Sequence, residues 1–351
     1  MGKIALIIPN NLWMCPYISI YTKLLDDKNV EYELISWDRN GKDEIGIQYH
    51  LSEKNRNKYL VFLSYLKFSR FLKKTIKDNE YDKLIVFSSQ VGIFLSSFLE
   101  KNFKNRYIFD YRDLSIEQNS IFAKRFKKVL SNSYANIISS PGFKKYLPAD
   151  FDYVISHNFD ASVVKKAIMD EVQTYADGDT MVLTIGALRT DMNIEVMDAL
   201  GNVPCVKLSF VGRGISAKYL ENYASSRGYQ NIVFTGYYEK EEEPAIYRNH
   251  TFVNIIYPRV PSHISALSNR FYNSLIYKRP MIVTSDTIQG DYVQQYNVGL
   301  VINNCDNLKE NLFEYRKNID IDNYVKQCNH LLSIFLDENR FFEERVRAFA
   351  D

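Results

Sequence analysis

The chain has 351 residues, of which 46% are hydrophobic, 25% are charged and 14% are aromatic. At roughly 150 residues per domain, this length predicts about two domains, and the composition excludes a largely disordered chain. The 44 basic and 42 acidic side chains leave a net charge of +2, so overall charge gives no reason to expect a nucleic-acid partner.

Cysteine and histidine spacing argues against a metal site. The four cysteines are too widely spaced for a ligand motif or a disulfide framework, and the five histidines form no paired cluster of the kind that binds zinc. We therefore expect neither a metal nor a cofactor. Met1–Lys3 leads directly into the apolar run Ile4–Ile8, and no apolar run approaches the ~20 residues that span a bilayer. This pattern favours an N-terminal strand and a cytoplasmic protein.

The first half of the chain alternates two kinds of segment. Short runs rich in Ile, Val, Leu and aromatic residues predict strands at 3–8, 31–35, 83–87, 106–109 and 136–138. Longer amphipathic stretches predict helices at 17–28, 53–77, 91–100 and 120–131. Alternation of this kind predicts a parallel sheet with helices on both faces.

A second series of the same kind follows. Strands are predicted at 181–185, 206–211, 232–234, 252–256 and 281–284, with helices at 193–200, 216–227, 242–249 and 266–277. We expect an α/β fold with an N-terminal domain at 1–160, a linker at 161–178, a second domain at 179–320 and a helical tail at 321–351 that packs back on the N-terminal domain. Both domains would be doubly wound. Their ligands would bind at the carboxyl ends of the strands, in the cleft between the domains.

The segment Leu267–Val283 carries the most informative pattern. It predicts a helix with Asn269 and Arg270 in its first turn, then a tight turn and a buried strand. A helix N-terminus offers free N–H groups and the positive end of the helix dipole, which favour a phosphate ligand. Arg270 would add a charge-assisted contact, and Asn273, one turn later, could hydrogen-bond a sugar hydroxyl. An ordinary surface helix is the alternative.

This segment resembles the donor-binding segment of GT-B glycosyltransferases of family 4, especially the bacterial capsular and exopolysaccharide enzymes. Ser268–Asn273 and Lys278–Ile282 fill the places of the family's pattern. Relatives commonly have two glutamates separated by seven residues, the second contacting the donor ribose, whereas this chain has Ser265 and Asn273 at the two positions. The resemblance implies two Rossmann-like domains facing across a cleft, and a nucleotide-sugar donor.

Three strand ends of the second domain fit the same resemblance. Gly186 ends the first strand and precedes Arg189, where relatives place a basic residue on the donor phosphates; a plain turn with a solvated arginine is the alternative. Gly212-Arg213-Gly214 follows the next strand, where relatives line the nucleotide pocket, but the third glycine of a dinucleotide fingerprint is missing. Tyr237 and Tyr238 follow a third strand, and either one could stack on the donor base, with packing in the core as the alternative.

In the N-terminal domain, polar residues follow two of the predicted strands. Arg112 and Asp113 come after the strand at 106–109, where acceptor-facing residues would lie, and relatives place a histidine at the position that Arg112 occupies. We expect one of the two to contact sugar hydroxyls near the reacting carbon, with an internal salt bridge as the alternative. Asn10 and Asn11, after the first strand, form the natural acceptor-side loop.

A basic aromatic stretch runs from Lys54 to Lys77, with eight basic residues and no acidic one. Such a surface suits an anionic membrane, where each basic residue contributes about 1 kcal/mol and aromatic residues favour the interface. We expect this contact to involve Lys67, Arg70, Lys73 and Lys74. A solvated helix whose aromatic residues pack on the sheet, and an RNA-binding patch, are the alternatives.

The resemblance implies a glycosyltransferase that moves a sugar from a nucleoside diphosphate to a lipid-linked saccharide in cell-surface polysaccharide synthesis. It implies retention of anomeric configuration without a metal, and a place on the inner face of the cell membrane. A nucleotide-sugar epimerase of the same architecture is one alternative. A non-catalytic nucleotide-sugar-binding partner is the other, because the glutamate pair is missing.

Overall fold

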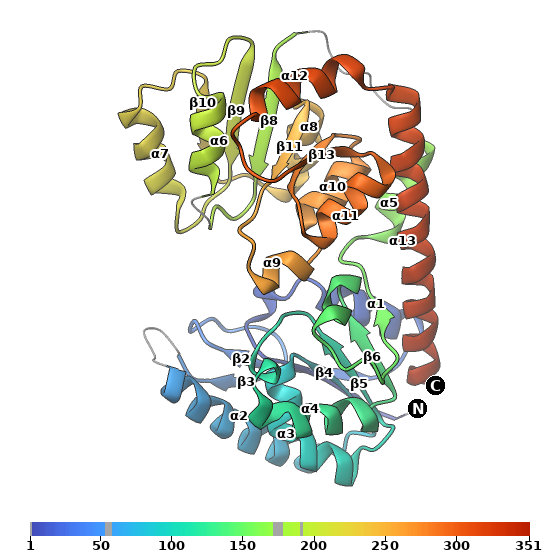
Figure 1. The fold of residues 1–351 in the computed structure, drawn as a ribbon. Coiled ribbons are helices and arrows are strands. Elements are labelled where there is room, and N and C mark those ends of the chain that lie inside the picture. The colour runs from blue at the N-terminus through green and yellow to red at the C-terminus, as the bar shows by residue number, and fades with distance from the viewer. Residues whose placement is uncertain (1, 53–57, 171–177, 190–191) are drawn as a thin grey trace. The chain divides into compact units, whose positions relative to one another are not determined.

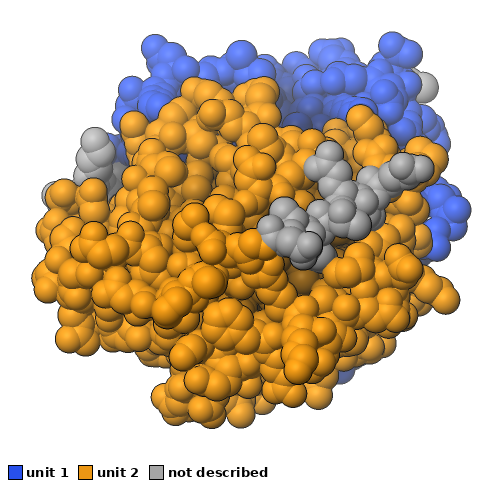
Figure 2. Space-filling model, turned by 90° about the horizontal axis from the view of Figure 1, so that it is seen from above, with its two compact units in different colours: residues 1–158, 337–351 blue, residues 159–336 orange. Residues whose placement is uncertain are grey.

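A computed structural model describes residues 2–52, 58–170, 178–189 and 192–351. The chain forms two compact units (Figure 2). Unit 1 contains residues 1–158 and 337–351, and unit 2 contains residues 159–336. Residues 53–57 of the expected basic helix and 171–177 of the expected linker lie outside the described residues.

Unit 1 is built on a seven-stranded parallel sheet with the order β3-β2-β1-β4-β5-β6-β7 (Figure 1). Its strands are β1 (Ile4–Ile8), β2 (Tyr32–Asp38), β3 (Ile47–His50), β4 (Lys83–Phe87), β5 (Tyr107–Tyr111), β6 (Ala135–Ile138) and β7 (Val154–Ile155). Ile4 pairs with Tyr32 on one side and with Lys83 on the other. Every residue of β1 is buried, as expected for a central strand that helices cover on both faces.

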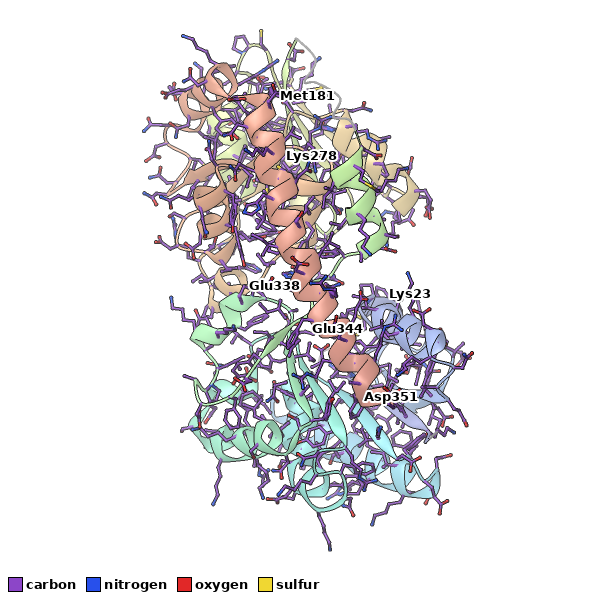
Figure 3. All side chains as sticks on the ribbon, turned by 90° about the vertical axis from the view of Figure 1, so that its right-hand side faces the viewer. Lys23, Met181, Lys278, Glu338, Glu344 and Asp351 are labelled. Carbon is purple, nitrogen blue, oxygen red and sulfur yellow. The ribbon has the colours of Figure 1, made fainter. Side chains whose placement is uncertain are left out.

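Helices cover both faces of this sheet. The helices of unit 1 are η1 (Leu12–Met14), α1 (Ile18–Asp27), α2 (Lys58–Asp78), α3 (Ser89–Asn102), η2 (Ile116–Gln118), α4 (Ser120–Asn132) and η3 (Pro141–Lys145). Helix α3 packs between α2 and α4. On the other face, Tyr21 of α1 shares a core with Phe342, Val346 and Phe349 of the last helix, α13 (Ile321–Ala350). Figure 3 shows Glu338 and Glu344 along this last part of α13, and Asp351 just after its end.

Unit 2 has a six-stranded parallel sheet with the order β10-β9-β8-β11-β12-β13. Its strands are β8 (Thr180–Ile185), β9 (Val206–Val211), β10 (Ile232–Gly236), β11 (Phe252–Ile255), β12 (Met281–Thr284) and β13 (Gly299–Ile302). Its helices, besides the first part of α13, are α5 (Ala161–Met169), α6 (Asn193–Leu200), α7 (Ala217–Ser226), η4 (Lys240–Glu242), α8 (Glu243–Arg248), α9 (Pro261–Ser265), α10 (Asn269–Ile276), α11 (Ile288–Tyr296) and α12 (Leu308–Asn318). Two apolar cores, one on each face, hold these layers together.

The division of the chain differs in detail from the expected boundaries. Residues 161–169, assigned to a linker from the sequence, form α5, whose Val164 is buried in the core of unit 2. The expected helical tail is one helix, but Leu331 and Phe335 belong to the core of unit 2 and only residues from Asp337 onward belong to unit 1. An apolar stripe therefore runs along the whole helix and contributes to two separate cores.

The predicted fold class, two doubly wound α/β domains followed by a C-terminal helix, is confirmed. Every strand predicted from the sequence is present, and both strand orders have the crossover of a doubly wound sheet. Three strands were missed: β3, β7 and β13. All three lie at sheet edges and are incompletely buried. Strand β3 reads Ile-Gln-Tyr-His and β7 has two residues, so neither has the continuous apolar run that marks a central parallel strand. Strand β13 reads Gly-Leu-Val-Ile, so its apolar run was a signal that the prediction missed.

Candidate functional site

The carboxyl edge of the sheet in unit 2 has the geometry of a ligand site. Strands β8 and β11 are neighbours, but the chain leaves β8 toward β9 and leaves β11 toward β12. Connections that diverge in this way leave a crevice at the strand ends, where doubly wound sheets bind their ligands. Gly186 follows β8, and α10 begins at the same edge. The glycine loops and the arginine helix predicted from the sequence therefore meet in one place.

Two glycines allow the loops after β8 and β9 to approach closely. Gly186 has φ +96° and Gly212 has φ +128°, a region that side-chain-bearing residues rarely adopt. The Gly186 N–H donates to Val211 O at 2.8 Å, and the Leu188 N–H donates to Arg213 O at 3.1 Å. A Cβ at Gly212 would lie 2.1 Å from Gly186 O, whereas a Cβ at Gly186 would meet nothing within 4 Å. The backbone at Gly186 is therefore open to a ligand.

Arg270 ties together the two strands that border the crevice. Ser268 caps α10 by accepting a hydrogen bond from Phe271 N at 3.3 Å, which places Arg270 in the first turn. The Arg270 guanidinium donates through Nε to Ile185 O, at the end of β8, and through Nη1 to Asn254 O of β11 at 3.3 Å. The described residues accept no other hydrogen bond from it, so further N–H groups of its five remain for a ligand.

A carboxylate that the sequence did not single out lies beside Asn273. Glu243, the first residue of α8, accepts hydrogen bonds from Asn273 Nδ2 at 3.3 Å and from the Tyr238 hydroxyl at 2.9 Å. Burial and the nearby Glu243 carboxylate raise the pKa of Tyr238, so it stays a protonated donor. Glu243 lies 30 residues from Asn273 in the sequence. Its one local signal is an acidic residue in a first helical turn, which many surface helices share.

The remaining predicted donor residues differ in burial. Arg213 and Gly214 are exposed, and the Arg213 guanidinium lies 5.1 Å from the ring centroid of Tyr237. Tyr237 is 58% exposed, not packed in the core, and its hydroxyl donates to Glu239 at 2.8 Å. Arg189 and Asn269 are also exposed. Ser265 is buried, and its hydroxyl donates to Pro261 O within α9 at 2.7 Å.

In unit 1, Arg112 forms a buried ion pair. Its Nε and Nη2 donate to the two oxygens of Asp110 at 2.7 and 2.8 Å, and Nη2 also donates to Ser156 Oγ at 3.1 Å. The Tyr21 hydroxyl donates to the same carboxylate at 2.5 Å. The Arg112 side chain is 8% exposed and that of Asp110 is fully buried. This is the internal salt bridge that the sequence left open as an alternative.

Asp113, the next residue, differs from Arg112 in its surroundings. It is exposed and forms no hydrogen bond with the described residues. Partial desolvation of its carboxyl group, opposed by the nearby Arg112 charge, raises the pKa of Asp113. Of the two residues predicted to touch an acceptor, Asp113 is therefore the more accessible.

The two asparagines after β1 have different environments. Asn10 is half-buried, and its Oδ1 accepts from Asn11 N at 3.0 Å. Asn11 is fully buried: its Nδ2 donates to Asp38 Oδ1 at 2.9 Å and its Oδ1 accepts from Arg39 N at 3.0 Å. Burial alone would raise the pKa of Asp38, but hydrogen bonds from Asn11, His50 and the backbone hold it far below the usual range. The side chain of Asn11 thus orders the loop after β2.

The described residues contain no cluster of three or more His, Cys, Asp or Glu side chains able to hold a metal ion. Among the described helices, none combines the length and the hydropathy that a bilayer-spanning segment needs.

No protein-family model matches the chain, and no curated protein is similar to it in sequence. Its structure is similar to that of sucrose-phosphate synthase from Thermosynechococcus elongatus, with a TM-score of 0.69 and 13% identity over 98% of both chains. It is also similar to α,α-trehalose-6-phosphate synthase from Burkholderia multivorans, with a TM-score of 0.68 and 11% identity over 99% of both chains. A third similar structure is Anabaena HepE in complex with UDP and glucose, with a TM-score of 0.66 and 11% identity over 98% of this chain and 99% of that one. With its two parallel-sheet α/β domains, the chain has the GT-B fold.

Proposed function

We propose that the protein is a glycosyltransferase that moves a sugar from a nucleoside diphosphate to a lipid-linked saccharide in the synthesis of a cell-surface polysaccharide. The observation that carries the proposal is that Gly186, Gly212 and Arg270 converge where the connections of β8 and β11 diverge, in a GT-B fold. HepE, a structural neighbour of the same fold, is complexed with UDP.

The donor diphosphate would lie against the first turn of α10 and the open backbone of Gly186. Free N–H groups and the positive helix end attract a diphosphate, and the remaining N–H groups of Arg270 would hydrogen-bond it. The Asn273 amide would donate to and accept from hydroxyls of the donor sugar nucleotide, and the Glu243 carboxylate would accept from them. The exposed ring of Tyr237 would stack on the base. The protein would act by positioning the substrates and stabilising the leaving diphosphate, with retention and without a metal.

On the acceptor side, Asp113 and Asn10 offer accessible polar groups at the carboxyl edge of the sheet in unit 1. Arg112 would act through Asp110 and Ser156 by holding the end of β5 in place. The acceptor saccharide would contact Asp113 near the reacting carbon.

A lipid-linked acceptor requires that the enzyme reach a membrane, and helix α2 presents a suitable surface. Its buried face carries Tyr65, Phe68, Leu72 and Ile76, so part of its aromatic content belongs to the core. Its exposed cations are Lys67, Arg70, Lys74 and Lys77, with Lys73 half-buried.

An apolar tip adjoins these cations at the start of α2 and of α4. Phe62 of α2 is 37% exposed and contacts Phe122 of α4, with ring centroids 6.4 Å apart, and the neighbouring Ile121 is 76% exposed. An apolar tip beside a cationic helix face suits an anionic bilayer, because cations bind headgroups while the apolar side chains enter the interface. We therefore propose a peripheral contact with the inner face of the cell membrane.

Titration with UDP, GDP and ADP, followed by calorimetry, tests the donor site. Removing one charge-assisted interaction costs about 1.5–3 kcal/mol, so Arg270→Ala should weaken binding of the preferred nucleotide by about 10- to 100-fold. Arg189→Ala should weaken it less. Arg248→Ala changes an exposed arginine at the end of α8 and should leave affinity unchanged. If neither Arg270→Ala nor Arg189→Ala changes the nucleotide affinity, the proposed donor site is wrong.

Product analysis with UDP- and GDP-sugars separates the proposed reaction from its alternatives. A glycosyltransferase should release nucleotide and elongate a lipid-linked acceptor, with release depending on the acceptor. Isomerisation of the sugar without an acceptor would identify an epimerase. Tight binding without turnover on any acceptor would favour a non-catalytic partner.

Sedimentation with anionic vesicles tests the membrane contact. Changing Lys67, Arg70, Lys73 and Lys74 to Gln should reduce the partition coefficient by about 100- to 1000-fold, since each cation contributes about 1 kcal/mol. The matched control changes four exposed lysines of unit 2, Lys218, Lys240, Lys309 and Lys317, to Gln. Equal loss in both variants, or no loss in the first, contradicts the proposed contact.

A further inference from the structure

Residues from β13, α12 and the start of α13 in unit 2 line a pocket of about 460 Å³. Figure 1 labels these three elements. Asn297, which precedes β13, and Asn318, at the end of α12, both line it. Because β13 begins and α12 ends there, the pocket lies at the amino edge of the sheet. The crevice that carries Gly186 and the start of α10 lies at the carboxyl edge. The pocket is therefore separate from the proposed donor site.

Uncommitted amide groups dominate the polar lining of this pocket. Four asparagines from three elements face it: Asn297, Asn311, Asn318 and Asn323. Their side chains form no hydrogen bond with any described residue, and neither does the carboxylate of Glu314. The hydroxyl of Tyr315, which also lines the pocket, is buried without a hydrogen-bond partner among the described residues.

The charges of the lining exclude several ligand classes. Within the described part of the chain, no lysine or arginine lines the pocket, whereas Glu314 and Asp320 do, so a phosphate or carboxylate ligand would be repelled. Asp320 already accepts a hydrogen bond from Asn323 N at 3.0 Å, which leaves Glu314 as the one carboxylate without a partner within the described lining. Among the described residues, no group of three or more metal-ligating side chains exists. The pocket therefore suits neither an anion nor a metal ion.

We propose that this pocket binds a neutral saccharide, at a site distinct from the sugar of the donor. An asparagine side chain offers a donor and an acceptor side by side, which matches two adjacent sugar hydroxyls. The uncommitted carboxylate of Glu314 accepts from the same groups. Leu300, Val301 and Ile319 supply apolar surface for the C–H faces of a sugar ring. The volume falls within the ~300–1,000 Å³ range of small-molecule sites.

Saturation-transfer NMR tests this proposal with the full-length protein and four neutral probes: maltotriose, cellotriose, mannotriose and N-acetylchitotriose. UDP is present at a saturating concentration to occupy the donor site. At least one probe should bind, and the double variant Asn311→Ala with Asn318→Ala should weaken its binding by about tenfold or more. Both asparagines are exposed helix residues, and alanine favours a helix, so the variant should fold. Asn249→Ala, an exposed asparagine of unit 2 outside the pocket, is the matched control.

Three results would overturn the proposal: no probe binds, the double variant binds as tightly as the unchanged protein, or only the cationic comparator spermidine binds. UDP titration of the same protein variants, in separate samples prepared without UDP, reports the donor site independently. A loss of saccharide binding with normal UDP binding therefore concerns this pocket alone.

Discussion

Arg112→Met removes the guanidinium from the buried ion pair of unit 1 while keeping an unbranched side chain of similar length. The Asp110 carboxylate then stays buried with the Tyr21 hydroxyl as a remaining donor, and Ser156 loses its contact to Arg112. Removing one partner of a buried pair leaves an uncompensated charge, which costs about 3–5 kcal/mol. We therefore expect unit 1 to be destabilised by this amount.

Urea unfolding followed by tryptophan fluorescence measures this cost in unit 1 alone, because Trp13 and Trp37, the two tryptophans of the chain, both belong to that unit. With a slope of about 2 kcal/mol per M of urea, a loss of 3–5 kcal/mol lowers the midpoint by roughly 1.5–2.5 M. Arg125→Met, on the exposed face of α4, is the control and should change stability by no more than about 0.5 kcal/mol.

The double variant Asp110→Asn with Arg112→Met separates charge from packing. It removes the stranded carboxylate, so it should recover a large part of the lost stability, as replacement of a whole buried pair commonly does. If Arg112→Met instead keeps the unchanged midpoint within about 0.3 M and abolishes sugar transfer, Arg112 acts on the substrate and the structural explanation fails.

Three further predictions concern residues whose environments the structure defines. The Cβ of Gly212→Ala would overlap Gly186 O, so this variant should destabilise unit 2 by about 1–3 kcal/mol and weaken UDP binding. Thermal unfolding measures the first effect and calorimetry the second; an unchanged melting temperature contradicts the prediction. Burial lowers the pKa of His157 despite its contact with Glu338, so the unfolded state binds the proton first as the pH falls below about 6.5. Between pH 7 and 5.5, the free energy of unfolding of unit 1 should therefore fall more steeply in the unchanged protein than in the His157→Gln variant, by at most about 1.4 kcal/mol per pH unit. Urea unfolding at several pH values measures both slopes, and equal slopes would refute the idea. Asn11→Ala should cost about 1–3 kcal/mol in the fluorescence assay, because it leaves Arg39 N without its acceptor; Asn10→Ala, half-buried, is the comparison and should cost less.

The regular part of the fold could be predicted from residue patterns because its signals are local. A central strand such as β1 is buried along its whole length and reads as a continuous apolar run. The edge strand β3 reads Ile-Gln-Tyr-His, is incompletely buried and shows no such run, so pairing with β2 decides its conformation. The sequence also did not predict that α13 leaves the core of unit 2 near Leu336 and joins the core of unit 1. Apolar residues line the helix on both sides of that point, so the pattern does not change there.

For the candidate site, the sequence alone determined which polar residues follow which strands, and therefore that Gly186, Gly212 and Arg270 come to one edge of a sheet. The tertiary structure decided which side chains remain available there. Arg112 is committed to Asp110 and Asn11 to Asp38, while Glu243 arrives beside Asn273 from a separate helix. The reason is physical: a buried polar group must be paired, and its partner comes from whichever part of the chain the fold brings near, which spacing along the sequence does not encode.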